Sequence, residues 1–211
     1  MTRILVADDH PVVRQGLRHI LAEEFAPAEV GEAKNGDEVM EQVQRRAWDI
    51  IVLDLSMPGK NGLDLIKDLK QQHPAVRLLV LTMLSEEQLA IRVLRAGAEG
   101  FLTKDEAPEE LVLAIKKILG GGKYVNPTLA QALTFDLVTR ESEKPLHAQL
   151  SDREYQVLCF IATGKSVKDI AGTLSLSIKT INTYRSRILE KLNLKSNVEL
   201  TRYVIEHRLN N

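Results

Sequence analysis

Reactive side chains follow four short apolar segments of this sequence, each close to the point where the segment ends. They are Asp8 and Asp9 after residues 4–7, Asp54 after 50–53, Thr82 after 78–81, and Lys104 after 100–102. A run of branched apolar residues predicts a strand buried on both faces, and the Pro-Gly pair at 58–59 is a turn signal beyond Asp54. We therefore expect each of these side chains at the carboxyl end of a buried strand.

These residue types together favour phosphoryl transfer. Three carboxylates in one crevice would repel each other, so the site requires a divalent cation, a lysine such as Lys104, or both. Oxygen ligands in this number suit Mg²⁺, which prefers one or two carboxylates together with phosphate oxygens and water. A carboxylate beside Mg²⁺ can attack a phosphoryl donor and form an acyl phosphate, while the cation and the ammonium group stabilise the transferred charge. The sequence therefore predicts a phosphoryl-transfer pocket that binds Mg²⁺.

Strand patterns alternate with helix patterns over residues 1–123, and these elements must position the reactive side chains. The strands are expected near 4–7, 29–33, 50–53, 78–81 and 100–102, and the helices near 11–21, 37–46, 65–69, 86–96 and 108–119. Such alternation is typical of an α/β domain with a five-stranded, doubly wound parallel sheet. Ligands of these sheets bind in the crevice beyond the carboxyl ends of the strands, where the acids, Thr82 and Lys104 would meet.

The charge distribution divides the chain of 211 residues into an acidic front and a basic end. Residues 1–125 contain 16 Lys and Arg against 20 Asp and Glu, whereas residues 146–211 contain 10 against 6. A basic C-terminal third predicts a second domain that binds a polyanion. No apolar run reaches the roughly 18 to 20 residues of a membrane span. The first three residues lead into a strand rather than a signal sequence, so we expect a cytoplasmic protein with no membrane partner.

A linker is predicted between the two domains, over residues 124–147. The glycines at 120–122 end the last helix of the first domain and form a flexible joint. Apolar residues within 127–138 recur at roughly helical spacing, which allows a short helix. The polar segment that follows, 139–149, contains a proline and is typical of a tether.

The second domain, residues 148–211, is predicted to be an all-α fold of four short helices. Ser151 and Glu154 form a capping-box pattern, and Ser166 and Ser177 can cap the two helices that follow. The apolar stripe expected on the third helix consists of Ile178, Ile181, Tyr184, Ile188 and Leu192. Two helices joined by a tight turn, the second with basic residues on its exposed side, predict a helix-turn-helix at about Ser166 to Arg185.

With these acids, the hydroxyl and the lysine at successive strand ends, residues 1–123 resemble a CheY-like receiver domain of two-component response regulators. The resemblance implies that a sensor histidine kinase phosphorylates Asp54. The implied Mg²⁺ ligands are Asp9, Asp54 and the backbone carbonyl of Ser56, with Asp8 nearby through water. The implied phosphate-binding and switch residues are Lys104, the Thr82 hydroxyl and the aromatic Phe101. Because Phe101 has no hydroxyl, it is expected to report phosphorylation by packing alone.

Residues 148–209 resemble a LuxR-type helix-turn-helix, on the motifs Leu150 to Glu154, Lys168 to Ala171 and Lys179 to Asn182. Together with a receiver, this resemblance implies the NarL/FixJ type of transcription regulator, which binds double-stranded DNA and is expected to be a homodimer when active. The implied base-reading residues are Asn182, Thr183 and Ser186, and the implied phosphate contacts are Lys179, Thr180, Arg185 and Lys191. The family commonly has His where Tyr184 stands. Phosphorylation would either uncover the recognition helix or promote dimers.

The same residues allow other interpretations. A phosphatase that turns over phosphate esters is disfavoured because no general base other than the acids follows a strand, so no catalytic residue is assigned and we do not expect an enzyme. The C-terminal helices could instead bind a partner protein. His10 adjoins Asp8 and Asp9, but a single histidine without partners at ligand spacing is more often a surface residue than a metal ligand.

Overall fold

The computed structural model describes the whole chain except residues 84–86, 127–129, 131–144, 175, 208 and 210–211. Two compact units are present: Met1–Ser85 and Leu89–Pro127 form the first, and the second includes Thr128–Asn211. The short helix predicted within 127–138 lies outside the described residues, apart from residue 130.

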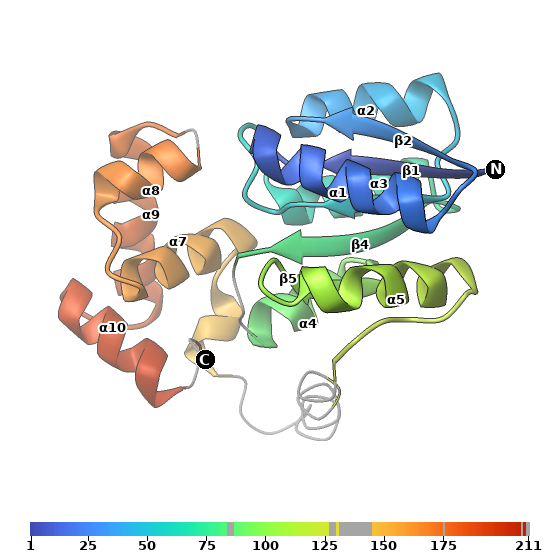
Figure 1. Cartoon of the computed structure of the whole chain (residues 1–211). Helices are drawn as coiled ribbons and strands as arrows, with labels where there is room; N and C mark the ends of the chain where they lie inside the picture. The colour runs from blue at the N-terminus through green and yellow to red at the C-terminus, as the bar shows by residue number, and fades with distance from the viewer. Residues whose placement is uncertain (84–86, 127–129, 131–144, 175, 208, 210–211) are drawn as a thin grey trace. The chain divides into compact units, whose positions relative to one another are not determined.

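The first unit is built on a sheet of five parallel strands in the order β2-β1-β3-β4-β5. The strands are β1 (Thr2–Ala7), β2 (Ala28–Ala33), β3 (Ile50–Leu53), β4 (Arg77–Thr82) and β5 (Gly100–Thr103) (Figure 1). The strand order reverses at β1, which has β2 on one side and β3 on the other. This reversal creates a switch point between β1 and β3, where doubly wound sheets bind ligands. The predicted fold class is confirmed.

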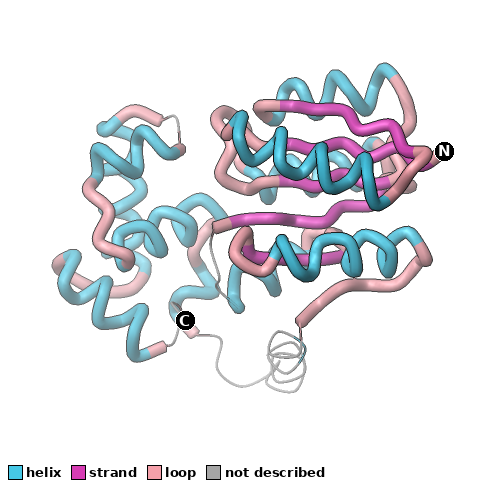
Figure 2. The backbone as a smooth tube through the Cα atoms, in the orientation of Figure 1, coloured by secondary structure: helices cyan, strands magenta, loops and turns pink. Residues whose placement is uncertain are grey.

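Helices cover both faces of this sheet (Figure 2). They are α1 (Pro11–Glu24), α2 (Gly36–Arg45), α3 (Gly62–Gln72), α4 (Glu87–Arg95) and α5 (Ala107–Leu119). Leu17 and Leu21 of α1 join Leu111 and Ile115 of α5 in one hydrophobic core with alternate residues of the strands. Residues on the opposite face of the same strands, such as Ile51, are equally buried, which explains the unbroken apolar runs.

The start of the predicted linker packs on the edge of the sheet. Tyr124 forms an isolated parallel bridge with Gly100, and its backbone N–H donates to the carbonyl of Glu99 at 2.8 Å. Its ring is buried in the same core as α1 and α5, and its hydroxyl donates to the Glu110 carboxylate. The backbone N–H of Phe101 donates in turn to the Tyr124 carbonyl. Residue 124, which we assign to the linker from sequence, is therefore hydrogen-bonded to the strand that leads to Lys104.

The second unit consists of short helices, as predicted. They are the 3₁₀ helix η1 (Leu146–Gln149), α7 (Asp152–Ala162), α8 (Val167–Thr173), α9 (Ile178–Lys191) and α10 (Asn197–Glu206). Ser151 and Glu154 form a complete capping box, and Ser166 and Ser177 cap α8 and α9 through their side chains. The turn η1 falls in a segment that the sequence predicts to be a tether. Among the described residues, no helix is long and apolar enough to cross a membrane.

Two members of the predicted stripe on α9 are not in the buried core. Ile181, Ile188 and Leu192 are buried, whereas Tyr184 is half-buried and Ile178 is 51% exposed. Ile178 is the first residue of α9, and its neighbours one turn along are the buried Ile181 and the exposed Asn182. It therefore lies at the margin of the buried stripe, and the prediction that it packs inward is wrong.

Candidate functional site

The register of the sheet brings the strand-end residues of the first unit to one place. Ala7 of β1 lies opposite Leu53 of β3, so Asp8 and Asp54 follow from neighbouring strands. The backbone N–H of Asp54 donates to the carbonyl of Ala7 at 2.8 Å. Thr82 lies opposite Thr103, and the backbone N–H of Lys104 donates to the Thr82 carbonyl at 2.8 Å. Backbone pairing therefore determines where these side chains start.

The Lys104 side chain connects two of the acids. Its Nζ lies 2.7 Å from Oδ2 of Asp54 and 2.7 Å from Oδ2 of Asp8. The other oxygen of Asp54, Oδ1, accepts a hydrogen bond from the backbone N–H of Ser56 at 2.9 Å. Asp54 is only 2% exposed and Asp8 is equally buried. Asp54 is thus a buried carboxylate with an ammonium group on one oxygen and an amide on the other.

The carboxylates of this cluster carry more negative charge than Lys104 neutralises. Burial raises the pKa of the Asp54 carboxyl and Asp8 adds to this effect, although the Lys104 ammonium and the Ser56 N–H oppose it. Burial alone would lower the pKa of Lys104, but attraction to Asp54 and Asp8 raises it above its ordinary value. Lys104 therefore remains protonated and contacts Asp8 and Asp54, but it supplies one positive charge to a cluster that also contains the Asp9 carboxylate.

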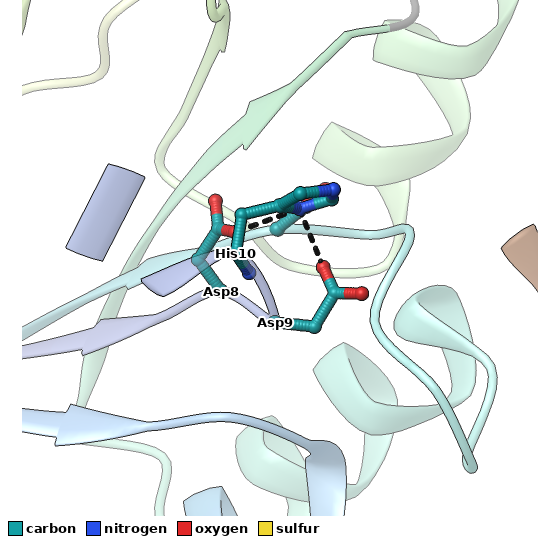
Figure 3. A group of neighbouring side chains, drawn as sticks. Asp8, Asp9 and His10 are labelled. Carbon is teal, nitrogen blue, oxygen red and sulfur yellow. Dashed lines mark hydrogen bonds and ion pairs between the residues drawn. The ribbon is translucent and has the colours of Figure 1, made fainter. Parts of the chain in front are cut away.

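The donor atoms of the cluster fit a divalent cation. Asp8, Asp9, His10 and Asp54 each offer one ligand atom, and these atoms all lie within 4.8 Å of one another. Figure 3 shows Asp8, Asp9 and His10 grouped at the end of β1. Three carboxylate oxygens at this spacing are compatible with Mg²⁺. A Mg²⁺ ion bound there would neutralise charge on a phosphoryl group. The nitrogen donor of His10 is not required for a magnesium site.

The two predicted switch residues are both buried. Thr82 is fully buried at the end of β4, and Phe101 is buried in β5 opposite Val80 of β4. The backbone of Phe101 is hydrogen-bonded to Tyr124, as described above. The structure therefore places Phe101 within the strand that leads to Lys104, with β4 on one side and Tyr124 at the start of the linker on the other.

The exposed face of α9 carries most of the residues predicted to contact DNA. Lys179, Asn182, Thr183 and Ser186 are all exposed, and their spacing of three, four and seven residues places them on one side of the helix. Thr180 is half-buried and its hydroxyl lies 2.8 Å from that of Ser177. This face is polar and accessible along the first two turns of the helix.

Arg185 and Lys191 have partners within the second unit. Arg185 Nε donates to Oδ1 of Asn197 in α10. Lys191 Nζ lies 2.6 Å from Oε2 of Glu154 and donates to the carbonyl of Gln149 at 3.3 Å. These side chains connect α9 to α10, α7 and η1, so a DNA phosphate would have to share or displace these partners. Their assignment as phosphate contacts stays a prediction.

Glu154 has a role that the sequence pattern does not reveal, because the capping box is a local motif and Lys191 is distant in sequence. Replacing Glu154 with Gln should keep the capping box, which accepts either residue, and remove the ion pair with Lys191. We expect the second unit to lose about 1–3 kcal/mol of stability at pH 7. Burial would raise the pKa of Glu154, but hydrogen bonds from Lys191 and Ser151 outweigh it and hold the pKa below its ordinary value.

The pH dependence follows from that direction. The ion pair should be fully stabilising above the unfolded pKa of about 4.3 and should be lost as the pH falls through the lower pKa of the folded state. Urea unfolding of the full chain can be followed by circular dichroism, while the fluorescence of Trp48, the only tryptophan, reports the first unit. The control is Glu190→Gln, because Glu190 is an exposed residue on α9 and its substitution removes the same charge without removing this ion pair. Equal stability of the two variants at pH 7 would contradict the ion pair's contribution.

Two family comparisons define the class of protein. Residues 4–116 match the family described as response regulator receiver domain. Residues 148–204 match the bacterial regulatory proteins of the luxR family. The chain therefore belongs to the two-component response regulators, and its combination of a receiver with a LuxR-type DNA-binding domain is that of the NarL/FixJ type.

Individual relatives match along both domains. Response regulator UvrY of Escherichia coli strain K12 is 37% identical over 211 residues, which cover 100% of this chain and 97% of UvrY. RcsB from Salmonella enterica serovar Typhimurium, bound to promoter rprA in the presence of phosphomimetic BeF₃⁻, is 28% identical with a TM-score of 0.65 and covers 97% of this chain and 98% of RcsB. The RcsB chain in a structure of two RcsB dimers bound to two parallel DNAs is 30% identical, with a TM-score of 0.59. The match covers 96% of this chain and 97% of that RcsB chain.

Proposed function

We propose that a sensor histidine kinase phosphorylates Asp54 of this response regulator and that the phosphorylated form binds specific DNA sequences through α9. The observation that carries the proposal is the buried Asp54 carboxylate, with Lys104 Nζ at 2.7 Å and two further acids at the same strand ends. An exposed polar face on α9 supplies the second half of the proposal. The RcsB structure with a promoter and a phosphomimetic supports the coupling of the two.

In the proposed reaction, an oxygen of Asp54 attacks the phosphorus of a phosphohistidine. The new O–P bond forms as the P–N bond breaks, and the electron pair returns to the histidine nitrogen of the kinase. Lys104 Nζ, which forms an ion pair with Asp54, would then contact the oxygens of the transferred phosphoryl group and stabilise their negative charge. Asp9, Asp54 and the Ser56 carbonyl, with Asp8 through water, would hold Mg²⁺, whose charge would stabilise the phosphoryl group during transfer.

The signal is proposed to leave the site through Thr82 and Phe101. A phosphoryl group adds negative charge and acceptor oxygens, which would draw the Thr82 hydroxyl and Lys104 toward Asp54. Phe101 would then repack in β5, whose backbone is hydrogen-bonded to Tyr124 at the start of the linker. This route needs no hydroxyl on residue 101.

On DNA, the first turns of α9 are proposed to enter the major groove. Asn182, Thr183 and Ser186 would contact base edges, because their short polar side chains are exposed on one face. Phosphate contacts are proposed for Lys179, Thr180, Arg185 and Lys191, which would set the position of the helix without reading sequence.

The active form is proposed to be a homodimer, as RcsB is on DNA. Val198 and Ile205 of α10 are 78% and 65% exposed and lie seven residues apart, on one side of the helix. Thr201, Arg202 and Glu206 complete the lining of a largely apolar depression beside them. Pairing of this face with a second copy would present two copies of α9 to half-sites about 34 Å apart.

Selection of bound fragments from random DNA tests this function directly. The full chain should enrich a motif with two half-sites, and a small phosphodonor such as acetyl phosphate should increase the enrichment. Binding should weaken steeply with salt, because phosphate contacts release counterions. Enrichment of no motif under either condition, together with a complex that forms without DNA and does not respond to salt, would instead support a protein-interaction domain.

A further inference from the structure

His10 is placed unusually for a residue at the start of a helix. It is the N-cap residue of α1, yet its side chain makes no capping hydrogen bond. Its ring instead points at the acids: Nδ1 lies 2.8 Å from Oδ1 of Asp9 and 3.3 Å from Oδ1 of Asp8 (Figure 3). The His10 side chain therefore does not cap α1, and it lies beside the proposed cation site instead.

The backbone that carries the ring is held by hydrogen bonds. The N–H of His10 donates to Oδ1 of Asp8 at 2.8 Å, and Arg14 Nη1 donates to the Asp8 carbonyl at 2.7 Å. Asp8 itself is buried and bound to Lys104. The short segment 8–10 is thus fixed by contacts at both of its peptide groups, so Nδ1 stays near the carboxylates without any ordering of a long side chain.

The distances suit direct ligation. Nδ1 of His10 and one oxygen each from Asp8, Asp9 and Asp54 all lie within 4.8 Å of one another. Transition metals bind imidazole nitrogen and carboxylate oxygen at about 2.0–2.2 Å, so donors on opposite sides of an ion are about 4–4.4 Å apart. A shift of a few tenths of an ångström would complete the site. In this structure Nδ1 is the hydrogen-bond donor to the Asp9 and Asp8 carboxylates, which can only accept, so a bound metal ion would replace the Nδ1 proton. The His10 side chain is 65% exposed, so Nε2 can then carry the ring proton in contact with water.

We propose that Nδ1 of His10 is a direct metal ligand, which makes this receiver's cation site selective for first-row transition dications over Mg²⁺. The inference rests on the proposed function, because it assumes that the acids bind a cation. An all-oxygen site suits Mg²⁺, whereas a nitrogen donor adds affinity for transition metals and little for Mg²⁺. The added affinity should increase from Mn²⁺ through Co²⁺ to Ni²⁺.

The test uses the full chain and Mn²⁺ as the probe. Electron spin echo envelope modulation should detect a directly coordinated imidazole nitrogen in the wild-type protein. His10→Gln should lose that signal, and its Mn²⁺ affinity relative to Mg²⁺, measured by competition for free Mn²⁺, should fall about 10-fold. His19→Gln is the matched control, since His19 is an exposed histidine on the same helix, and it should change neither value. Trp48 fluorescence verifies that both variants are folded.

Two contrary results have different meanings. Stoichiometric Mn²⁺ binding with no nitrogen signal, or with a signal that His10→Gln retains, would overturn the inference and leave the proposed phosphorylation of Asp54 intact. Failure of the wild-type protein to bind either Mn²⁺ or Mg²⁺, or binding that Asp54→Asn does not weaken, would overturn the cation site itself and with it the proposed function.

Discussion

Replacing Asp54 with Asn should abolish transfer of phosphate from a small phosphodonor to this protein. Asn lacks the anionic oxygen that attacks phosphorus, and it cannot form an acyl phosphate. The substitution keeps the size of the side chain and can still accept the hydrogen bond from the Ser56 N–H, so the fold should be retained. Radiolabelled acetyl phosphate with Mg²⁺ measures the incorporation, and loss of label on treatment with hydroxylamine identifies an acyl phosphate.

The same strand provides a matched control. Asp49 lies before β3, at the opposite end from Asp54, and its Oδ2 accepts a hydrogen bond from the backbone N–H of Arg3. Asp49→Asn should therefore incorporate label like the wild-type protein. Label that persists at equal yield in Asp54→Asn would show that another carboxylate is the acceptor, and Asp8 and Asp9 would be the next to test.

The position of Asp54 could be predicted because the information is local. In a strand, four branched apolar residues in a row place apolar side chains on both faces, so both faces must be buried. Such strands are typical of the parallel sheets of α/β domains. Parallel strands deliver their carboxyl ends to one edge, so the residue after each run is placed by the run itself. The positions of Asp8, Thr82 and Lys104 can be predicted by the same argument. Backbone pairing brings their strand ends together.

What the sequence does not predict depends on contacts between distant residues. The pairing of Tyr124 with Gly100 needs an open sheet edge at β5, which no local pattern specifies. The ion pair of Lys191 with Glu154 joins two helices, so a basic helix face alone could not distinguish a DNA contact from an internal one. His10 is exposed, as its spacing indicates, but the contacts of its ring with Asp8 and Asp9 depend on side-chain orientations that spacing does not specify.

On DNA, the largest effects are expected from two residues of α9 that differ in what they would contact. Asn182→Ala should relax base preference at one position of each half-site, because an Asn that bonds a base edge discriminates by about 1–3 kcal/mol. Lys179→Ala should weaken binding to all sequences by a similar factor and reduce the slope of log affinity against log salt by about 1 per site. Both side chains are exposed, so neither change removes core packing.

Affinities for the selected sequence and for single-base variants of it, each measured at several salt concentrations, separate the two effects. Arg45→Ala is the control, because it removes an exposed positive charge from the first unit and should leave affinity and salt slope unchanged. A base contact changes the ranking of sequences, whereas a phosphate contact changes only the common offset, since phosphates are the same at every base pair. Identical profiles for Asn182→Ala and Lys179→Ala would therefore mean that α9 lies on the backbone rather than in the groove, and that another element reads the sequence.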